Sequence, residues 1–266
     1  ETAAMSLVES WYVHHYDEWD RLERHRIEFE ITKRYLDEFI PGGGLRILDI
    51  GGGPGRYSIY LAEKGHRVTL LDLAKKNVEL ARVKAVEAGV KLEAFIHGNA
   101  LDLSQVEGSY DAVLLMGPLY HLLDENDRRR SISEALQVLK PDGLIFAAFI
   151  SSYAPIQDYL KSLYPVDSSD DILSYLEDGG NKAGEGFTEA YFSGIDEARD
   201  LMNSFELEEL AFVGVENVLA SREMAINELE EDQFNKWLDI CYRLGKDRNL
   251  MGSSEHLLYI GRFLLK

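Results

Sequence analysis

Residues 47 to 55 read Ile-Leu-Asp-Ile-Gly-Gly-Gly-Pro-Gly, an apolar strand pattern that runs directly into a glycine-rich turn. A helical pattern follows over residues 55–64, and a second apolar run, Val68 to Leu71, ends at Asp72. Strand, turn, helix and strand in this order predict a βαβ unit of the nucleotide-binding kind. Glycine lets the backbone approach a ligand where a Cβ would clash. The carboxylate of Asp72 can accept hydrogen bonds from two ribose hydroxyls, so we expect a cofactor that contains adenosine.

The spacing of the glycines separates this turn from that of the dinucleotide folds. Those folds usually carry Gly-x-Gly-x-x-Gly, whereas here Gly51, Gly53 and Gly55 alternate after Asp49. The pattern Asp-x-Gly-x-Gly-x-Gly resembles motif I of the class I methyltransferases that depend on S-adenosylmethionine. Four later segments resemble the same family: VTLLDLAKKNVELAR, FIHGNALDL, SYDAVLLMGPLYHL and EALQVLKPDGLIFAAF. The resemblance is close over residues 42–150. It implies S-adenosylmethionine as cofactor and a member of the small-molecule branch, of the quinone-biosynthesis type.

Strands and helices alternate from residue 45 to residue 150, which is typical of a parallel sheet covered by helices. Together with the resemblance, this alternation predicts an α/β fold: a doubly wound, seven-stranded, mostly parallel sheet whose last strand is antiparallel. We expect strands at 45–50, 67–71, 91–96, 111–116, 143–150, 207–213 and 256–264. Helices are expected at 55–64, 75–88, 126–139 and 195–204, with further helical material at 222–245.

Two segments lie outside this alternation. Residues 11–40 form one amphipathic helical pattern rich in aromatic residues. Residues 151–194 hold two short helical patterns, 156–163 and 170–176, and a long loop. Insertions of this length in a compact domain are usually functional. We therefore predict an N-terminal helical lid at 1–41, a cofactor-binding core at 42–150, a helical substrate cap at 151–194 and a C-terminal completion of the sheet at 195–266.

The first βαβ unit supplies the first candidate ligands of the cofactor. The resemblance implies that Asp49 orients the glycine loop and reaches the cofactor's ammonium group, and the alternative role is a simple cap on the turn. Gly51 and Gly53 are expected to lie against the cofactor, and Gly55 to pack between helix and sheet. Asp72 is expected to bind the ribose. Its alternative role is to cap the helix that starts near residue 75.

The remaining cofactor candidates follow the second, third and fourth strands, because ligands in this fold bind beyond the carboxyl ends of the strands. Leu73 is expected to pack against the adenine, and Asn99 and Ala100 to form the adenine loop. Relatives often have an acid at the position of Asn99, and the carbonyl oxygen of an asparagine can accept the same hydrogen bond. Backbone carbonyls at Met116 and Gly117 are expected to receive the ammonium group.

Tyr120 and His121 follow the fourth strand, where the transferred methyl group should point. Histidine is the usual base near neutral pH, so both residues are catalytic candidates, in proton removal or in acceptor placement. The alternative is a histidine that only binds a loop carbonyl. In the N-terminal helix, a set of aromatic residues forms either a packing stripe or a lid over the sulfonium: Tyr12, His14, His15, Tyr16, Trp19 and His25. As part of a lid, Arg24 or Arg26 could bind the cofactor's carboxylate.

Composition limits which acceptors and which cellular compartment we expect for this protein. The net charge of −19 repels phosphate backbones, so we expect no nucleic-acid partner. The tetrapeptide Gly-Pro-Leu-Tyr after the fourth strand also lacks the second proline of the nucleic-acid amino-methyltransferases. No apolar run approaches the roughly 20 residues of a membrane span, and no secretory signal opens the chain. The single cysteine, Cys241, excludes an internal disulfide and a cysteine metal cluster. We therefore expect a cytoplasmic protein without a metal site.

The predicted function is methyl transfer from S-adenosylmethionine to a small-molecule acceptor, by in-line attack on the sulfonium methyl. Two alternatives stay open. A non-catalytic cofactor-binding module would keep the same binding residues. An NAD-dependent oxidoreductase is disfavoured by the alternating glycines and by the absence of a second cofactor-binding half. The sequence reveals neither the acceptor atom nor the oligomeric state.

Overall fold

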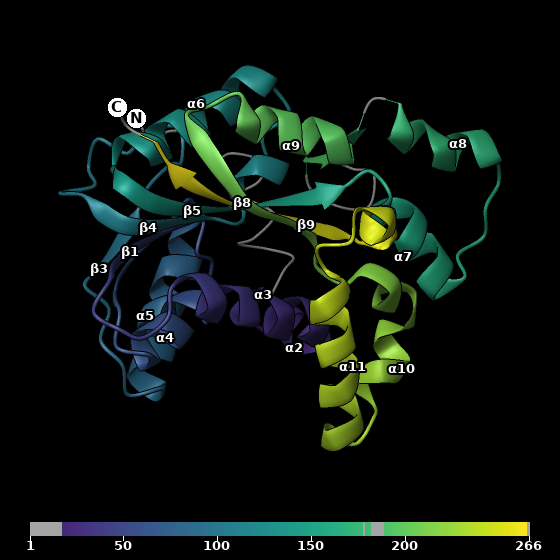
Figure 1. Ribbon diagram of the computed structural model, residues 1–266, viewed down its shortest axis with the longest axis horizontal. Coiled ribbons are helices and arrows are strands. Elements are labelled where there is room, and N and C mark those ends of the chain that lie inside the picture. The colour runs from purple at the N-terminus through teal and green to yellow at the C-terminus, as the bar shows by residue number, and fades with distance from the viewer. Residues whose placement is uncertain (1–17, 178, 182–188, 265–266) are drawn as a thin grey trace.

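The computed structural model describes residues 18–177, 179–181 and 189–264, which form one sheet with helices on both faces (Figure 1). Within these residues, seven strands make the main sheet in the order β3, β2, β1, β4, β5, β9, β8. Strands β1 to β5 run parallel, and β9 runs antiparallel to both of its neighbours. The predicted fold class is thus confirmed. The strands are β1 (Arg46–Ile50), β2 (Arg67–Asp72), β3 (Ala94–His97), β4 (Tyr110–Leu115), β5 (Leu139–Ser151), β8 (Leu207–Gly214) and β9 (His256–Phe263).

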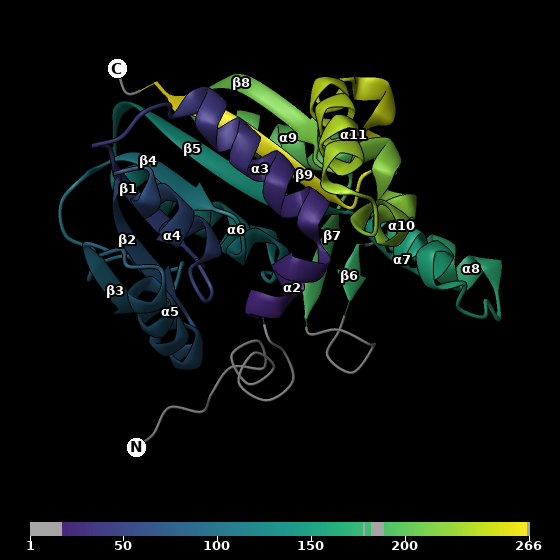
Figure 2. The ribbon, with the colours of Figure 1, turned by 90° about the horizontal axis from the view of Figure 1, so that it is seen from below.

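Two sets of helices cover the two faces of the sheet (Figures 1 and 2). One face packs against α3 (Arg26–Phe39), α4 (Arg56–Glu63), α5 (Lys75–Glu87) and α11 (Glu231–Leu244). The other face packs against α6 (Glu125–Gln137) and α9 (Ile195–Asn203). Neighbouring strand residues alternate between the two cores, with Ile47 in the first and Leu48 in the second. Burial on both faces explains why the central strands read as nearly unbroken apolar runs.

The N-terminal helical pattern is interrupted in the structure. It contains α2 (Glu18–Arg24) and α3, and His25 between them has φ −97° and ψ 57°, outside the helical region. In α3, Ile27, Ile31 and Leu36 are fully buried in the core beneath the sheet. Each such side chain contributes about 1.5–3 kcal/mol by burial. The helix α3 is therefore an integral part of the core, whereas the sequence pattern suggests a separable lid.

The segment from 151 to 194 contains the two expected short helices, α7 (Ala154–Ser162) and α8 (Ser169–Leu173). It also contains β6 (Gly180–Asn181) and β7 (Ala190–Ser193), which pair antiparallel to each other. Strand β7 adds to the main sheet by pairing in parallel with the last two residues of β5. The sequence does not predict these strands, because two to four residues are too few to establish an alternating pattern.

The helical material expected at 222–245 is α10 (Glu223–Asn227) and α11. Other element ends differ from expectation by a few residues, which is usual for boundaries. Strand β3 begins at Ala94 and β5 at Leu139, where residues 91 and 143 are expected. In the described residues, no helix combines the length and the apolar character that crossing a lipid bilayer requires.

Candidate active site

A cavity of about 280 Å³ opens at the carboxyl ends of β1 and β4. Here the strand order reverses, since the chain runs outward from β1 to β3 and returns to β4 on the other side of β1. Ligands of open α/β sheets bind at such a reversal. The cofactor and catalytic candidates that follow the strands all line this cavity: Asp49, Gly51, Gly53, Asp72, Leu73, Asn99, Ala100, Met116, Gly117, Tyr120 and His121. The cavity is therefore the candidate active site.

The glycine loop brings two backbone segments into close contact at the reversal. Gly51 has φ +73°, and a Cβ there would lie 2.7 Å from Cδ of Pro118, so the position requires glycine. A Cβ on Gly117 would lie 3.0 Å from the Gly51 carbonyl oxygen. Gly55 faces Ala81 instead, where a Cβ would lie 3.3 Å from that residue's Cβ. Gly51 and Gly117 thus shape the cavity, and Gly55 serves the packing of helices on the sheet.

Asp72 is buried and joins the glycine loop to the start of α5. Its Oδ2 accepts a hydrogen bond from the backbone N–H of Gly53 at 2.8 Å. Its Oδ1 accepts from the backbone N–H of Ala74 at 2.8 Å and from Asn77 Nδ2 at 3.2 Å. The carboxylate therefore ties the glycine loop to the residues around the start of α5, but the N-cap residue of that helix is Ala74, so Asp72 does not take the alternative role of N-cap. Each carboxylate oxygen can accept from more than one donor, so these contacts are compatible with ribose binding.

Asp49 lies buried beneath the glycine loop. Its Oδ2 accepts a hydrogen bond from the Ser58 hydroxyl at 2.7 Å. A Cβ on Gly52 would lie 2.8 Å from the same oxygen, so glycine lets the loop close over the carboxyl group. Burial, with a contribution from the negative charge of Asp72, raises the pKa of Asp49 to about 7, although the Ser58 hydrogen bond lowers it. A cationic ligand group beside Asp49 would favour the ionised form again.

The loops after β2 and β3 form a mostly apolar wall, to which Leu73 and Ala100 contribute. The carbonyl of Leu73 lies 2.9 Å from His97 Nε2, so this histidine supports the loop. Asn99 is exposed at the mouth, and its Oδ1 accepts from the backbone N–H of Leu101 at 2.9 Å. Asn99 Oδ1, the oxygen expected to face an adenine amino group, therefore already accepts a hydrogen bond within its own turn.

Tyr120 and His121 lie together after β4, with ring centroids 4.9 Å apart. The Tyr120 hydroxyl donates to the Met116 carbonyl at 3.3 Å. His121 Nδ1 lies 3.1 Å from the Glu189 carbonyl oxygen. Because a carbonyl only accepts, Nδ1 carries the proton and Nε2 is the unprotonated nitrogen. Burial, with a contribution from the charge of Arg21, lowers the pKa of His121 to about 4, so the ring is neutral at pH 7.

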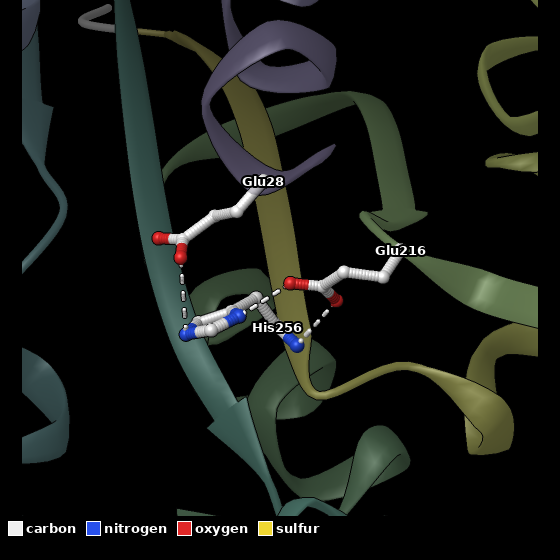
Figure 3. A group of neighbouring side chains, drawn as sticks. All are labelled: Glu28, Glu216 and His256. Carbon is white, nitrogen blue, oxygen red and sulfur yellow. Dashed lines mark hydrogen bonds and ion pairs between the residues drawn. The ribbon is translucent and has the colours of Figure 1, made fainter. Parts of the chain in front are cut away.

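The cavity also contains a second group of polar residues, which the sequence does not predict as site residues. Arg21 comes from α2, Glu28 from α3, Tyr57 from α4 and His256 from β9. Arg21 donates to both carboxylate oxygens of Glu28, at 2.7 and 3.0 Å. His256 Nδ1 pairs with Oε1 of Glu216 at 2.5 Å (Figure 3). These residues are distant in the sequence and belong to no common motif, so only the fold brings them together.

The cations at the cavity also differ from those expected. Arg26 donates to Glu231 at 3.1 Å, and Arg24 is exposed. Neither lines the cavity within the described part of the chain, whereas Arg21 and Arg56 do. The hypothesis that Arg24 or Arg26 binds a cofactor carboxylate is therefore not supported by their positions.

The aromatic set of the N-terminal segment is described only in part. Trp19 packs under the guanidinium of Arg56, with 4.7 Å between Cζ and the ring centroid. His25 Nδ1 pairs with Glu223 at 3.1 Å and does not line the cavity of the described structure. The other members, Tyr12, His14, His15 and Tyr16, lie outside the described residues.

Comparison with known proteins shows that this chain is similar to methyltransferases. A family model described as a methyltransferase domain matches residues 47–143. The chain is 30% identical to a ubiquinone biosynthesis O-methyltransferase of Aromatoleum aromaticum over 165 residues, which cover 60% of this chain and 67% of the relative. With three other curated methyltransferases the match spans 46% to 62% of their lengths.

Solved structures extend the similarity over most of the chain. A S-adenosylmethionine-dependent methyltransferase from Methanosarcina mazei has a TM-score of 0.57 and 25% identity, with 89% of this chain and 98% of that chain covered. A magnesium protoporphyrin IX methyltransferase from Synechocystis with bound S-adenosylmethionine has a TM-score of 0.57 and 14% identity, covering 99% and 100%. The second comparison concerns the fold alone.

Proposed function

This chain belongs to the class I S-adenosylmethionine-dependent methyltransferases, and from that premise we propose that its cavity brings the cofactor together with a small-molecule acceptor. The proposal is supported by one observation above all. A single cavity contains both the expected cofactor residues and a separate group of polar side chains that those roles leave unused. We call the first group the cofactor side (Asp49, Gly51, Gly53, Asp72, Leu73, Asn99). The second is the acceptor side (Arg21, Glu28, Tyr120, His121, His256).

The cofactor side fits S-adenosylmethionine in shape and charge. At Gly51 a Cβ would collide with Pro118, so glycine lets the loop pack against the segment after β4 and line the cavity with backbone. The carboxylate of Asp72 is an acceptor suited to ribose hydroxyls, and the apolar Leu73 is suited to the adenine ring. The buried carboxyl of Asp49 suits the ammonium group. Arg56, at the first turn of α4, suits the carboxylate, because a helix N-terminus favours negative charge.

When bound, S-adenosylmethionine supplies an electrophilic methyl group on a sulfonium centre. The protein's contribution is to hold the acceptor in contact with that group and to exclude water, which can be worth several kcal/mol without covalent help. His121 is neutral, and the Glu189 carbonyl fixes its tautomer. Its Nε2 is therefore suited to accept a hydrogen bond from the acceptor. A pKa of about 4 makes it a weak base, so placement is its main role.

Size and charge support a small acceptor. Sites for small molecules typically enclose about 300–1,000 Å³, and this cavity, at about 280 Å³, is near the lower limit. The net charge of −19 disfavours nucleic acid. The ubiquinone biosynthesis O-methyltransferase relatives are consistent with a small-molecule acceptor and with transfer to oxygen for this chain as well.

Transfer of label tests this proposal against its alternatives. Protein, methyl-labelled S-adenosylmethionine and a cell extract are incubated, and the extract is separated into metabolite, protein and nucleic-acid fractions. We expect label in the metabolite fraction, and much less of it when the variant Asp72→Ala replaces the wild type at a cofactor concentration below saturation. Label in a macromolecular fraction would overturn the small-molecule assignment. Cofactor binding without transfer to any fraction would favour the non-catalytic module.

A thermal-shift series separates the cofactors. S-adenosylmethionine and S-adenosylhomocysteine should raise the melting temperature at micromolar concentration, because a ligand that binds only the native state stabilises it. NAD should leave the melting temperature unchanged. Stabilisation by NAD alone would favour the NAD-dependent oxidoreductase instead.

A further inference from the structure

Glu28 and His256 form an ion pair on the acceptor side of the cavity, with facing atoms too far apart for a hydrogen bond (Figure 3). Oε2 of Glu28 lies 3.8 Å from Nε2 of His256. Hydrogen bonds between such atoms span roughly 2.7–3.2 Å. Glu28 comes from the core helix α3 and His256 begins β9. The two side chains are thus held at a fixed separation by the packed core of the domain.

Each of the two side chains is oriented from behind by a second charged residue. Arg21 binds Glu28 through two hydrogen bonds, at 2.7 and 3.0 Å. Glu216 binds His256 Nδ1 through its Oε1 at 2.5 Å. Its Oε2 accepts from the backbone N–H groups of Glu255 at 3.2 Å and His256 at 2.9 Å. Both oxygens of Glu216 therefore have donors, and the imidazole is oriented with Nε2 toward Glu28.

These contacts fix the charges of the group. Burial raises the pKa of Glu28, but Arg21 and His256 lower it to about 2, so Glu28 is ionised. Burial lowers the pKa of His256, but Glu28 and Glu216 raise it to about 9, so the ring is protonated. Two carboxylates, one guanidinium and one imidazolium then sum to zero charge. Toward the gap, Glu28 offers only an acceptor and His256 only a donor.

We propose that the pair Glu28 and His256 binds a hydroxyl group of a neutral acceptor, which donates to Glu28 Oε2 and accepts from His256 Nε2–H. A hydroxyl is both donor and acceptor. An oxygen at ordinary hydrogen-bond distance from both atoms fits a separation of 3.8 Å. The inference rests on the proposed function, and deepens it by assigning the acceptor to the neutral, hydroxylated compounds.

Two other occupants agree less well with the contacts. The ligand atoms of Glu28, Glu216 and His256 lie within 4.8 Å of one another, a spacing that could hold a metal ion. However, Arg21 already places a cation on Glu28, and the Nδ1 proton of His256 lies against Glu216. An ionised acceptor would add a net charge to a buried group that is already balanced, which is costly.

Binding of small aromatic probes tests the proposal directly. Protein loaded with S-adenosylhomocysteine is titrated at pH 7.5 with phenol, fluorobenzene, benzoate or benzylammonium, and binding is followed by ligand-observed NMR. Phenol should bind most tightly, because it alone is neutral and carries a hydroxyl. Glu28→Gln should weaken phenol binding by about tenfold or more, since a hydrogen bond to a charged group is lost. Fluorobenzene should bind wild type and variant equally.

Two further variants separate the site from general damage. Glu216→Gln leaves the cavity wall intact but removes the partner of His256, and should weaken phenol binding in the same direction. Glu223→Gln removes another buried carboxylate, which binds His25 and Lys161 away from the cavity, and should leave phenol binding unchanged. Melting temperature and S-adenosylhomocysteine affinity are measured for each variant, so that loss of folding is recognised.

Three results would overturn the hydroxyl site. One is phenol binding that Glu28→Gln and Glu216→Gln leave unchanged. The second is tighter binding of benzoate or benzylammonium than of phenol. The third is Mg²⁺ or Zn²⁺ binding to wild type that is lost in Glu28→Gln. Failure of S-adenosylhomocysteine to bind the wild type would instead count against the proposed function, and is read from the loading step itself.

Discussion

The two sides of the cavity are built from the chain in different ways. The cofactor side comes from consecutive strand ends between Asp49 and Asn99, and much of it is backbone and small residues. The acceptor side combines Tyr120 and His121, which follow β4, with the charged Arg21, Glu28 and His256, which come from the two ends of the chain. The difference suggests that cofactor binding is a local property of the βαβ units, whereas acceptor recognition depends on the complete tertiary structure.

The largest expected effect concerns the N-terminal segment, which supplies the acceptor side but also the core. Deleting residues 1–40 removes α3, whose Ile27, Ile31 and Leu36 are fully buried. At about 1.5–3 kcal/mol each, their loss approaches the roughly 5–15 kcal/mol that stabilises a typical domain. We expect the shortened protein to be unfolded by circular dichroism.

A shorter deletion is the control. Removing residues 1–24 takes away Arg21 and α2 but keeps α3, so the protein should fold and bind S-adenosylhomocysteine while methyl transfer is lost. If the protein still folds after deletion of residues 1–40, α3 is a separable lid. The acceptor side would then not depend on the packed core.

The fold, and the gathering of Asp49, Gly51, Asp72 and their neighbours in one cavity, could be predicted from sequence because their signals are local. The apolar runs ending at Ile50 and Asp72 mark strands, and Gly51 marks a turn that only glycine can adopt. On the acceptor side, Tyr120 and His121 could be predicted from their place after the fourth strand, but the charged residues Arg21, Glu28 and His256 have no such signal. Nothing in the neighbourhood of Glu28 or His256 reveals that they lie 3.8 Å apart. The helical pattern of residues 11–40 likewise does not distinguish a core helix from a lid, since both are amphipathic.

A smaller effect is expected from protonation on the cofactor side. Burial raises the pKa of Asp49 to about 7, so below pH 7 the carboxyl is largely protonated. Binding of an ammonium group then requires loss of that proton, and affinity for S-adenosylhomocysteine should fall below pH 7, by at most about tenfold per pH unit. Calorimetric titrations between pH 5.5 and 8.5 check this.

Two variants are compared with the wild type in these titrations. Asp49→Asn should flatten the profile, and Asp102→Asn, at an exposed acid whose side chain bonds to Ser104, should leave it unchanged. If the wild-type profile is as flat as that of Asp49→Asn, Asp49 does not contact the ammonium group.

The smallest effect is expected in the pH dependence of stability on the acceptor side. The pKa of His256 is raised from its ordinary value of 6.5 to about 9 by Glu28 and Glu216, against the effect of burial. The stabilisation from its charged form is therefore complete below pH 6.5 and lost as the pH rises through 9. Urea unfolding should show that the stability difference between wild type and His256→Asn shrinks from pH 6 to pH 10. A constant difference would mean that His256 is neutral in the folded protein.

The division of the cavity into two sides is tested most directly by calorimetric titration of S-adenosylhomocysteine into Asp72→Ala and Glu28→Gln. Asp72→Ala should weaken binding by about tenfold or more, because an ionised acceptor for the ribose hydroxyls is lost and the Gly53 N–H loses its partner. Glu28→Gln should bind within about twofold of the wild type, because Glu28 lies beside His256 on the acceptor side of the cavity. Equal and large losses in both variants would contradict the division and place Glu28 in the cofactor site.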